Sequence, residues 1–171
     1  MIVGIGGRSR SGKTTLAEAL VWHERTQNNR AIALHQDDFV KRIYDIPLIQ
    51  GEIDWETPAS IDFESLKKTI SFLKTDFDFI VVEGFLPFAD AELNAMYDGR
   101  FFTTISEETF RLRKATDDRW GEIPAWYINH IWESFQKYGQ PPTDLPPLME
   151  VNGEKPYNMD EILTFMQSFA K

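Results

Sequence analysis

The sequence has no cysteine, and its basic residues are fewer than its acidic ones. Without cysteine, disulfides, thiolate metal sites and cysteine nucleophiles are excluded, and a reducing compartment is expected. The 18 Lys and Arg residues against 27 Asp and Glu residues leave a formal net charge of −9. A chain this acidic repels a phosphate backbone, so we expect no general binding to nucleic acid.

Long apolar runs are missing as well. No run approaches the roughly 18 apolar residues that a membrane-spanning helix needs. At the N-terminus a few apolar residues come before Arg8 and Arg10, which reverses the order of charge and apolar segment in a signal peptide. We therefore expect a cytoplasmic protein with no membrane partner.

The composition that remains is that of an ordinary globular domain. The chain has 171 residues, of which 42% are hydrophobic and 13% aromatic. A length of roughly 100–200 residues predicts one domain, here residues 1–171. A domain of this size buries a sizeable core without disulfides or metals to hold it.

Short apolar segments alternate with helical patterns along the chain. The expected strands are Ile2–Gly6, Ala31–Gln36, Phe79–Glu83, Phe101–Ile105 and Leu148–Asn152. The expected helices are Lys13–Asn28, Asp62–Lys74, Ser106–Arg119, Pro124–Lys137 and Met159–Ala170. This alternation predicts the α/β class, with a parallel sheet of about five strands flanked by helices and ligands at the carboxyl ends of the strands. The stretch 40–60 has no clear periodicity, and loops of that length are usually functional or disordered.

The strongest chemical signal is Gly7-Arg8-Ser9-Arg10-Ser11-Gly12-Lys13-Thr14, a complete G-x-x-x-x-G-K-[ST] motif between an apolar strand and a helix. Its glycines let backbone N–H groups point inward around phosphate oxygens at a helix N-terminus. Lys13 would reach the β- and γ-phosphates of a nucleotide, and the Thr14 hydroxyl would bind Mg²⁺. The expected nucleotide-binding residues are Gly7, Ser9, Ser11, Gly12, Lys13, Thr14 and Thr15. A P-loop NTPase fold that binds ATP and Mg²⁺ is predicted.

Acidic residues follow two of the other strands. Asp37 and Asp38 come directly after the second strand, where they could accept a proton from a substrate hydroxyl or could cap a turn. Glu83 ends the apolar third strand, which favours a Mg²⁺-associated acid over a solvated carboxylate at the sheet edge.

Taken together, several segments resemble the uridine kinase and nicotinamide riboside kinase family. The matching segments are Gly4–Gly7, Ser11–Ala17, Gln36–Phe39, Asp54-Trp55-x-x-Pro58-x-Ser60-x-Asp62, Glu83–Phe85, and Phe101-Phe102-x-Thr104-Ile105 with Arg111–Lys114. The similarity runs in register from Ile2 to about Tyr138. The Gln-Asp-Asp-Phe form and the region from Trp132 to Tyr138 favour nicotinamide riboside kinase over uridine kinase.

The resemblance implies roles for individual residues. Asp37 matches the general base, Asp54 the residue that holds ribose hydroxyls, and Glu83 the Mg²⁺-associated acid. Arg113 and Lys114 fall where basic residues of a short lid, about residues 113–125, meet phosphates or substrate.

This chain also departs from the family pattern. Asp117 and Asp118 precede Arg119 where more positive charge is usual, and Lys114 stands where an arginine is common. Lysine does not form the bidentate fork of arginine. Trp55 is a candidate to stack on a flat base, although most aromatic side chains pack in cores.

The sequence thus predicts an ATP-dependent kinase that transfers the γ-phosphoryl group to the 5′-hydroxyl of a ribonucleoside: nicotinamide riboside first, then uridine or cytidine. Two alternatives remain open, a P-loop kinase for another hydroxyl compound such as pantothenate or a sugar, and a nucleotide-binding regulator without catalysis. The combination of Asp37 and Glu83 disfavours the regulator, because a protein that only binds nucleotide needs no base. The expected partners are ATP and a small nucleoside-like substrate, bound by a monomer or a homodimer.

Overall fold

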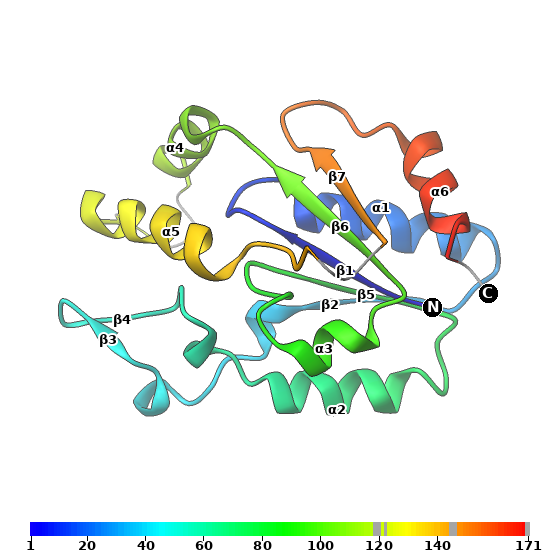
Figure 1. Ribbon diagram of the computed structural model, residues 1–171, viewed down its shortest axis with the longest axis horizontal. Coiled ribbons are helices and arrows are strands. Elements are labelled where there is room, and N and C mark those ends of the chain that lie inside the picture. Colours follow the sequence, from blue (N-terminus) through cyan, green and yellow to red (C-terminus); the bar gives the residue numbers. More distant parts are fainter. Residues whose placement is uncertain (118–120, 122, 144–146, 170–171) are drawn as a thin grey trace.

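A five-stranded parallel sheet forms the centre of the protein (Figure 1). The computed structural model describes residues 1–117, 121, 123–143 and 147–169. The strands are β1 (Ile2–Gly7), β2 (Ala31–His35), β5 (Phe79–Gly84), β6 (Gly99–Thr104) and β7 (Leu148–Asn152). Their order is β2-β5-β1-β6-β7, and every pairing is parallel. The predicted α/β fold with a parallel sheet of five strands is confirmed.

Helices cover both faces of this sheet (Figure 1). They are α1 (Lys13–Thr26), α2 (Phe63–Leu73), α3 (Ala91–Met96), α4 (Glu107–Ala115), α5 (Ala125–Tyr138) and α6 (Met159–Gln167). Successive strand residues point to opposite faces, so Val81 packs with α1 and α6 while Val82 packs with α2, α3 and α5. The strands are buried on both faces, which explains their nearly continuous apolar sequences. Within the described residues, no helix is long and apolar enough to cross a membrane.

Several element ends differ from the sequence-based expectation. The helix expected over Ser106–Arg119 ends at Ala115, where the Thr116 hydroxyl turns back to the carbonyls of Leu112 and Arg113. Ser106 caps its start, accepting the N–H of Thr109 as expected. The last helix ends at Gln167 rather than Ala170, and β6 begins two residues earlier than expected, at Gly99. Asp118, Arg119 and Ala170 lie outside the described residues.

The stretch that showed no periodicity folds into short elements. After η1 (Gln36–Asp38) come η2 (Ile43–Asp45), the hairpin strands β3 (Leu48–Ile49) and β4 (Glu52–Ile53), and η3 (Pro58–Ser60). Gln50 and Gly51 join the hairpin strands with φ angles of 51° and 89°. Positive φ at both central residues is the geometry of a type I′ turn, whose twist suits a two-residue hairpin. The hairpin lies beside α5 in Figure 1.

Candidate active site

The phosphate-binding loop runs from the end of β1 to the start of α1. Gly12 is the N-cap of α1 and has a φ of +93°, a conformation that L side chains rarely adopt. A Cβ atom there would also collide with the Tyr157 hydroxyl, which donates a hydrogen bond to the Gly12 carbonyl at 2.7 Å. Lys13, Thr14 and Thr15 form the first turn of α1, whose N–H groups have no partner within the helix. This loop and helix start make an anion-binding site of the expected kind.

Side chains from two other elements, β6 and α4, hold this loop in place. The Ser11 and Thr103 hydroxyls are hydrogen-bonded to each other, which ties the loop to β6. Arg113 of α4 donates from Nη1 to the carbonyls of Arg10, at 2.9 Å, and Gly153, at 3.0 Å. Arg113 therefore lies against the phosphate-binding loop, and its expected contact with phosphates stays a prediction. The hydrogen bonds of its Nη1 fix the backbone of that loop.

A predicted metal-binding pair comes together between α1 and β5. The Thr14 hydroxyl donates to Oε1 of Glu83 at 3.0 Å. Glu83 is buried, and the same oxygen lies 2.8 Å from Nδ1 of His35, its neighbour in the β2–β5 register. The hydrogen bond to Glu83 is the main cause of a raised pKa at His35.

The side-chain oxygens of Thr14 and Glu83 suit a Mg²⁺ ion whose remaining ligands come from the substrate. Among the described residues, no group of three or more histidine and acidic side chains is placed to hold a metal by itself. Mg²⁺ characteristically takes one or two protein oxygens and fills its remaining positions with phosphate oxygens and water. The hydroxyl of Thr14 and the carboxylate of Glu83 fit that role.

Asp37 lies on η1, directly after β2, and its side chain is accessible from the carboxyl edge of the sheet. The pKa of Asp37 is raised because neighbouring atoms remove part of its hydration, and also because Glu83 and Asp38 repel its charge. Lys13 opposes this shift by attraction, so the predicted base lies within the electrostatic field of the phosphate-binding lysine. The turn itself is anchored by buried Gln36, whose Oε1 accepts the Leu86 N–H at 2.8 Å.

The predicted acceptor-binding residues follow β4. Oδ1 of Asp54 accepts the backbone N–H of Glu56 at 3.1 Å and lies 2.7 Å from Nε2 of His130. Oδ2 of Asp54 accepts no hydrogen bond from the residues that the structure describes. Trp55 is 40% exposed, so its ring is accessible to a ligand.

Glu56 is a residue that the sequence reasoning missed. Burial raises the pKa of its carboxyl to about 7, with repulsion from Asp37 and Asp54 adding to the shift. Lys114 and Lys13 attract its charge and oppose the shift. Glu56 thus lies within the electrostatic range of the phosphate-binding lysine, the predicted base and the predicted lid lysine. Its place two residues after Asp54, inside the segment that resembles the nucleoside-binding part of the family, was the available signal.

Lys114 is buried on α4, with Nζ at 3.5 Å from Oδ2 of Asp117. Asp117 also reaches Arg10 of the phosphate-binding loop at 3.9 Å. The acidic residue that departed from the family pattern therefore links the end of α4 to that loop. Arg119, which follows Asp117 and Asp118 in the predicted lid, lies outside the described residues.

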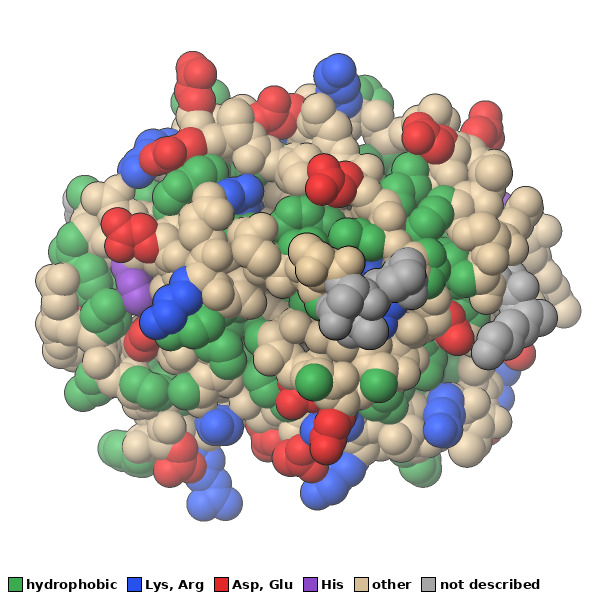
Figure 2. Space-filling view, viewed as in Figure 1, with side chains coloured by type: hydrophobic (Ala, Val, Ile, Leu, Met, Phe, Trp, Pro, Cys, Tyr) green, Lys and Arg blue, Asp and Glu red, His purple; other side chains and the backbone are tan. Residues whose placement is uncertain are grey.

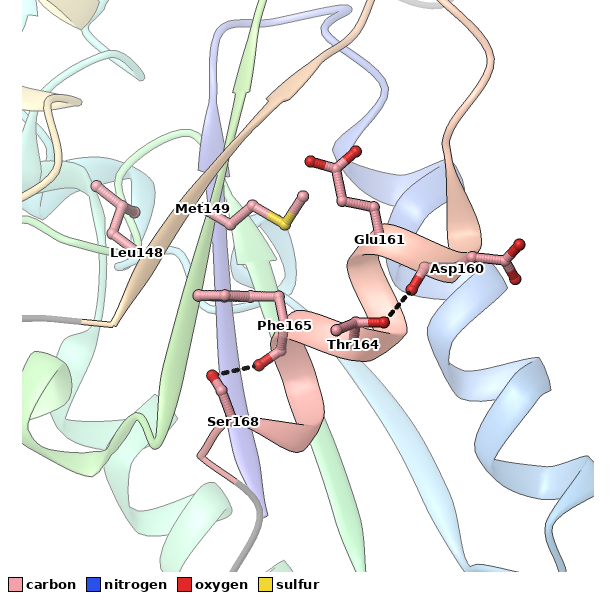
Figure 3. Close-up of a pocket in the computed structure, with 7 residues that line it drawn as sticks. All are labelled: Leu148, Met149, Asp160, Glu161, Thr164, Phe165 and Ser168. Atoms are coloured by element: carbon pink, nitrogen blue, oxygen red, sulfur yellow. Dashed lines mark hydrogen bonds between the residues drawn. The ribbon is translucent and has the colours of Figure 1, made fainter.

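A groove of about 660 Å³ lies elsewhere, between the start of β7 and α6 (Figure 3). Its charged lining residues are Asp160 and Glu161, which repel phosphate. On the face shown in Figure 2, acidic and basic side chains are interspersed, with hydrophobic ones reaching the surface between them. The carboxyl edge of the sheet therefore remains the candidate site.

Comparison with known proteins supports this assignment. No family model matches the chain. Nicotinamide riboside kinase 2 of Homo sapiens is 29% identical in an alignment that covers 94% of this chain and 74% of that protein. Nicotinamide riboside kinase 1 of Homo sapiens is 29% identical in an alignment that covers 84% of this chain and 79% of that protein. The resemblance to this kinase family is confirmed.

Solved structures show the same fold. A sugar kinase from Janibacter sp. superposes with a TM-score of 0.65 at 16% identity, covering 99% of this chain and 98% of that one. A possible uridine kinase from Bacillus stearothermophilus has a TM-score of 0.52 at 21% identity, covering 80% and 83%. The predicted P-loop NTPase fold is confirmed.

Proposed function

We propose, from the resemblance to nicotinamide riboside kinases and uridine kinases, that the protein transfers the γ-phosphoryl group of ATP to the 5′-hydroxyl of a ribonucleoside. The observation that carries this proposal is the meeting of three groups at one edge of the sheet. Lys13 of the phosphate-binding loop, the accessible carboxylate of Asp37 and the carboxylate of Glu56 lie within one another's electrostatic influence. A phosphate site, a base and an acceptor site are the parts that such a transfer requires.

The phosphate-binding loop supplies the donor half. Backbone N–H groups around Gly7–Gly12 and the side chains of Ser9 and Thr15 surround the phosphates, and the Lys13 ammonium stabilises charge that develops on them. The buried Ser11 hydroxyl, predicted to bind nucleotide, instead holds the loop through Thr103. Thr14 and Glu83 would hold Mg²⁺, which when bound neutralises charge on the β- and γ-phosphate oxygens. Arg113, through its bonds to Arg10 and Gly153, keeps the loop in this shape and closes over the transferring group.

Asp37 is the general base of the proposal. Its carboxylate accepts the proton of the 5′-hydroxyl and directs the freed oxygen toward the γ-phosphorus. The side chain is exposed and can therefore contact a substrate, and the attraction of Lys13 opposes the rise in pKa that desolvation causes.

The acidic turn after β4 supplies the acceptor half. The ribose 2′- and 3′-hydroxyls donate hydrogen bonds to Oδ2 of Asp54 and to the carboxylate of Glu56. Trp55 stacks on the base, and Lys114 adds a basic group to the lining of the acceptor site. Nicotinamide riboside is the first choice of acceptor. The relatives at 29% identity are named nicotinamide riboside kinases, and an acidic site favours the cationic nicotinamide ring. Uridine and cytidine come next.

The alternatives have weaker support. The sugar kinase neighbour shares 16% identity and therefore supports the fold alone. A nucleotide-binding regulator would need neither Asp37 beside Lys13 nor the acidic turn that faces both. The proposal treats residues 1–171 as one cytoplasmic P-loop kinase domain with a lid at about 113–125, acting as a monomer or a homodimer.

The test measures ADP release from Mg²⁺-ATP with nicotinamide riboside, uridine, cytidine, pantothenate or a simple sugar added in turn. We expect ADP release to depend on a ribonucleoside. Release with pantothenate or a sugar alone would replace the acceptor assignment, and release that no acceptor stimulates would contradict the kinase.

A further inference from the structure

Two side chains of helix α5 form hydrogen bonds with the segment Ile53–Glu56, which we call the acceptor turn. The Tyr127 hydroxyl donates to the Ile53 carbonyl at 3.1 Å and accepts the Trp55 N–H at 3.3 Å. One turn further along the helix, Nε2 of His130 lies 2.7 Å from Oδ1 of Asp54. Three consecutive residues of the turn, from Ile53 to Asp54 and Trp55, are thus held by one helix.

The pair of Asp54 and His130 is well shielded from water. Their side chains are 16% and 15% exposed, and 76 residues separate them in the chain. A hydrogen bond with one charged partner is strengthened by such partial burial, and losing one partner leaves the other without compensation. This contact therefore constrains the turn more than an exposed surface pair would.

The same carboxylate oxygen connects His130 to Glu56. Oδ1 of Asp54 accepts the Glu56 backbone N–H at 3.1 Å while it is held by His130. Fixing Oδ1 fixes the Asp54 rotamer, and the hydrogen bond to Glu56 then fixes the direction in which the chain leaves the turn. The Glu56 carboxylate and Oδ2 of Asp54 are the two groups that the proposed function assigns to the ribose hydroxyls.

We propose that His130 is a positioning residue that acts through Asp54 to aim the acidic turn at the acceptor. This inference rests on the proposed function, since it concerns how the acceptor site is held. The hydrogen bonds and ring contact of His130 within the described residues are with Asp54, Ser134 and Tyr127, none of which belongs to the phosphate-binding loop. Loss of His130 should therefore be seen in acceptor binding and leave ATP binding unchanged.

The experiment compares three variants of the full chain with the wild-type enzyme. His130→Leu removes the ring N–H, His130→Gln retains an amide N–H donor, and His23→Leu is the matched control on α1, remote from the acceptor turn. For His130→Leu we expect the acceptor KM to rise about tenfold or more, the loss typical of one charge-assisted hydrogen bond, with kcat lowered less than threefold. The KM for ATP should stay unchanged, His130→Gln should recover most of the loss, and His23→Leu should match the wild type.

A double-mutant cycle keeps the inference falsifiable if His130→Leu folds poorly. Asp54→Asn should raise the acceptor KM, and His130→Ala combined with Asp54→Asn should cost less than the sum of the two single changes, because both remove one interaction. An unchanged acceptor KM in His130→Leu, equal losses in the KM values for ATP and acceptor, or additive effects in the cycle would each overturn the inference. Failure of the wild-type enzyme to phosphorylate any ribonucleoside would instead contradict the proposed function.

Discussion

The proposed donor and acceptor halves of this site are built in different ways. The donor half is centred on one continuous stretch, Gly7–Thr15, in which backbone N–H groups and three residues with positive φ, Gly7, Arg10 and Gly12, shape the site. The acceptor half is assembled from side chains of separate segments: Asp54 and Glu56 after β4, Lys114 on α4, and Tyr127 and His130 on α5.

This difference reflects the two ligands. The triphosphate of the donor is an invariant anion that a helix N-terminus and its loop bind by general electrostatics. An acceptor has its own shape and its own pattern of hydroxyls, which require side chains aimed from several directions. Changes in the donor half should therefore abolish transfer to every acceptor, whereas changes in the acceptor half should alter the choice among acceptors.

The largest effect is expected for Lys13→Ala. The ammonium stabilises charge that develops on the phosphates, so its loss should lower kcat about 1,000-fold or more for every nucleoside. Steady-state kinetics with several acceptors measures this, and the melting temperature shows that the fold is retained. Near-native turnover in the folded variant would contradict the phosphate-binding role.

A second large effect is expected for Asp37→Asn. The amide keeps the shape but accepts no proton, so kcat should fall about 100- to 10,000-fold while ATP affinity changes little. Asp38→Asn is the matched control, one residue further along η1. If Asp38→Asn is the more damaging change, the base is Asp38.

Replacing the acceptor sugar should give an intermediate effect. A 2′-deoxynucleoside lacks one charge-assisted hydrogen bond to the site. We therefore expect its kcat/KM in the wild-type enzyme to be roughly 10- to 150-fold lower than that of the ribonucleoside. Asp54→Ala and Glu56→Gln should each reduce that discrimination, because the site then loses an acceptor for the hydroxyl. Kinetics on matched ribose and deoxyribose pairs measures it. Equal wild-type rates on both sugars would argue against the nucleoside assignment and favour the pantothenate or sugar kinase.

The smallest effect concerns stability and its dependence on pH. The pKa of Glu56 is about 7 in the folded protein and 4.5 for the unperturbed group, so the folded state holds the proton more tightly than the unfolded state. The stability that this adds is complete below pH 4.5 and is lost as the pH rises through 7. The full shift corresponds to about 3 kcal/mol, and solvent access to the half-buried side chain reduces the expected value to about 1–2 kcal/mol.

Glu56→Gln removes that ionisation and should raise the melting temperature at pH 8 by roughly 2–6 °C while changing it little at pH 4. Thermal unfolding of both proteins at the two pH values is the measurement. An equal shift at both values would show that Glu56 acts on stability by packing and not by charge. The acceptor kcat/KM of the wild type should rise between pH 6 and 8 as Glu56 ionises.

The conformation of the phosphate-binding loop could be predicted from the sequence because its determinants are local. The motif Gly7–Thr14 specifies the loop and the start of α1, and Glu83 was recognisable as a charge that ends an apolar strand. The parallel sheet followed from the alternation of elements, which continuous apolar strands such as β5 make clear.

The acceptor half was harder because its determinants are tertiary. No spacing rule connects Asp54 with His130, and the pKa of Glu56 depends on burial that appears only after folding. The β3–β4 hairpin has two residues in each strand, too few to show an alternating pattern. Helix α3 has six residues, which leaves little room for a helical repeat.

Transfer of a labelled γ-phosphoryl group from Mg²⁺-ATP to nicotinamide riboside tests the central claim most directly. The product is identified by mass and by the phosphorus–proton coupling that locates the phosphate. We expect one labelled 5′-monophosphate for each ADP formed, with no transfer by Lys13→Ala. Label found only in inorganic phosphate, or on pantothenate or a sugar but on no nucleoside, would contradict the account.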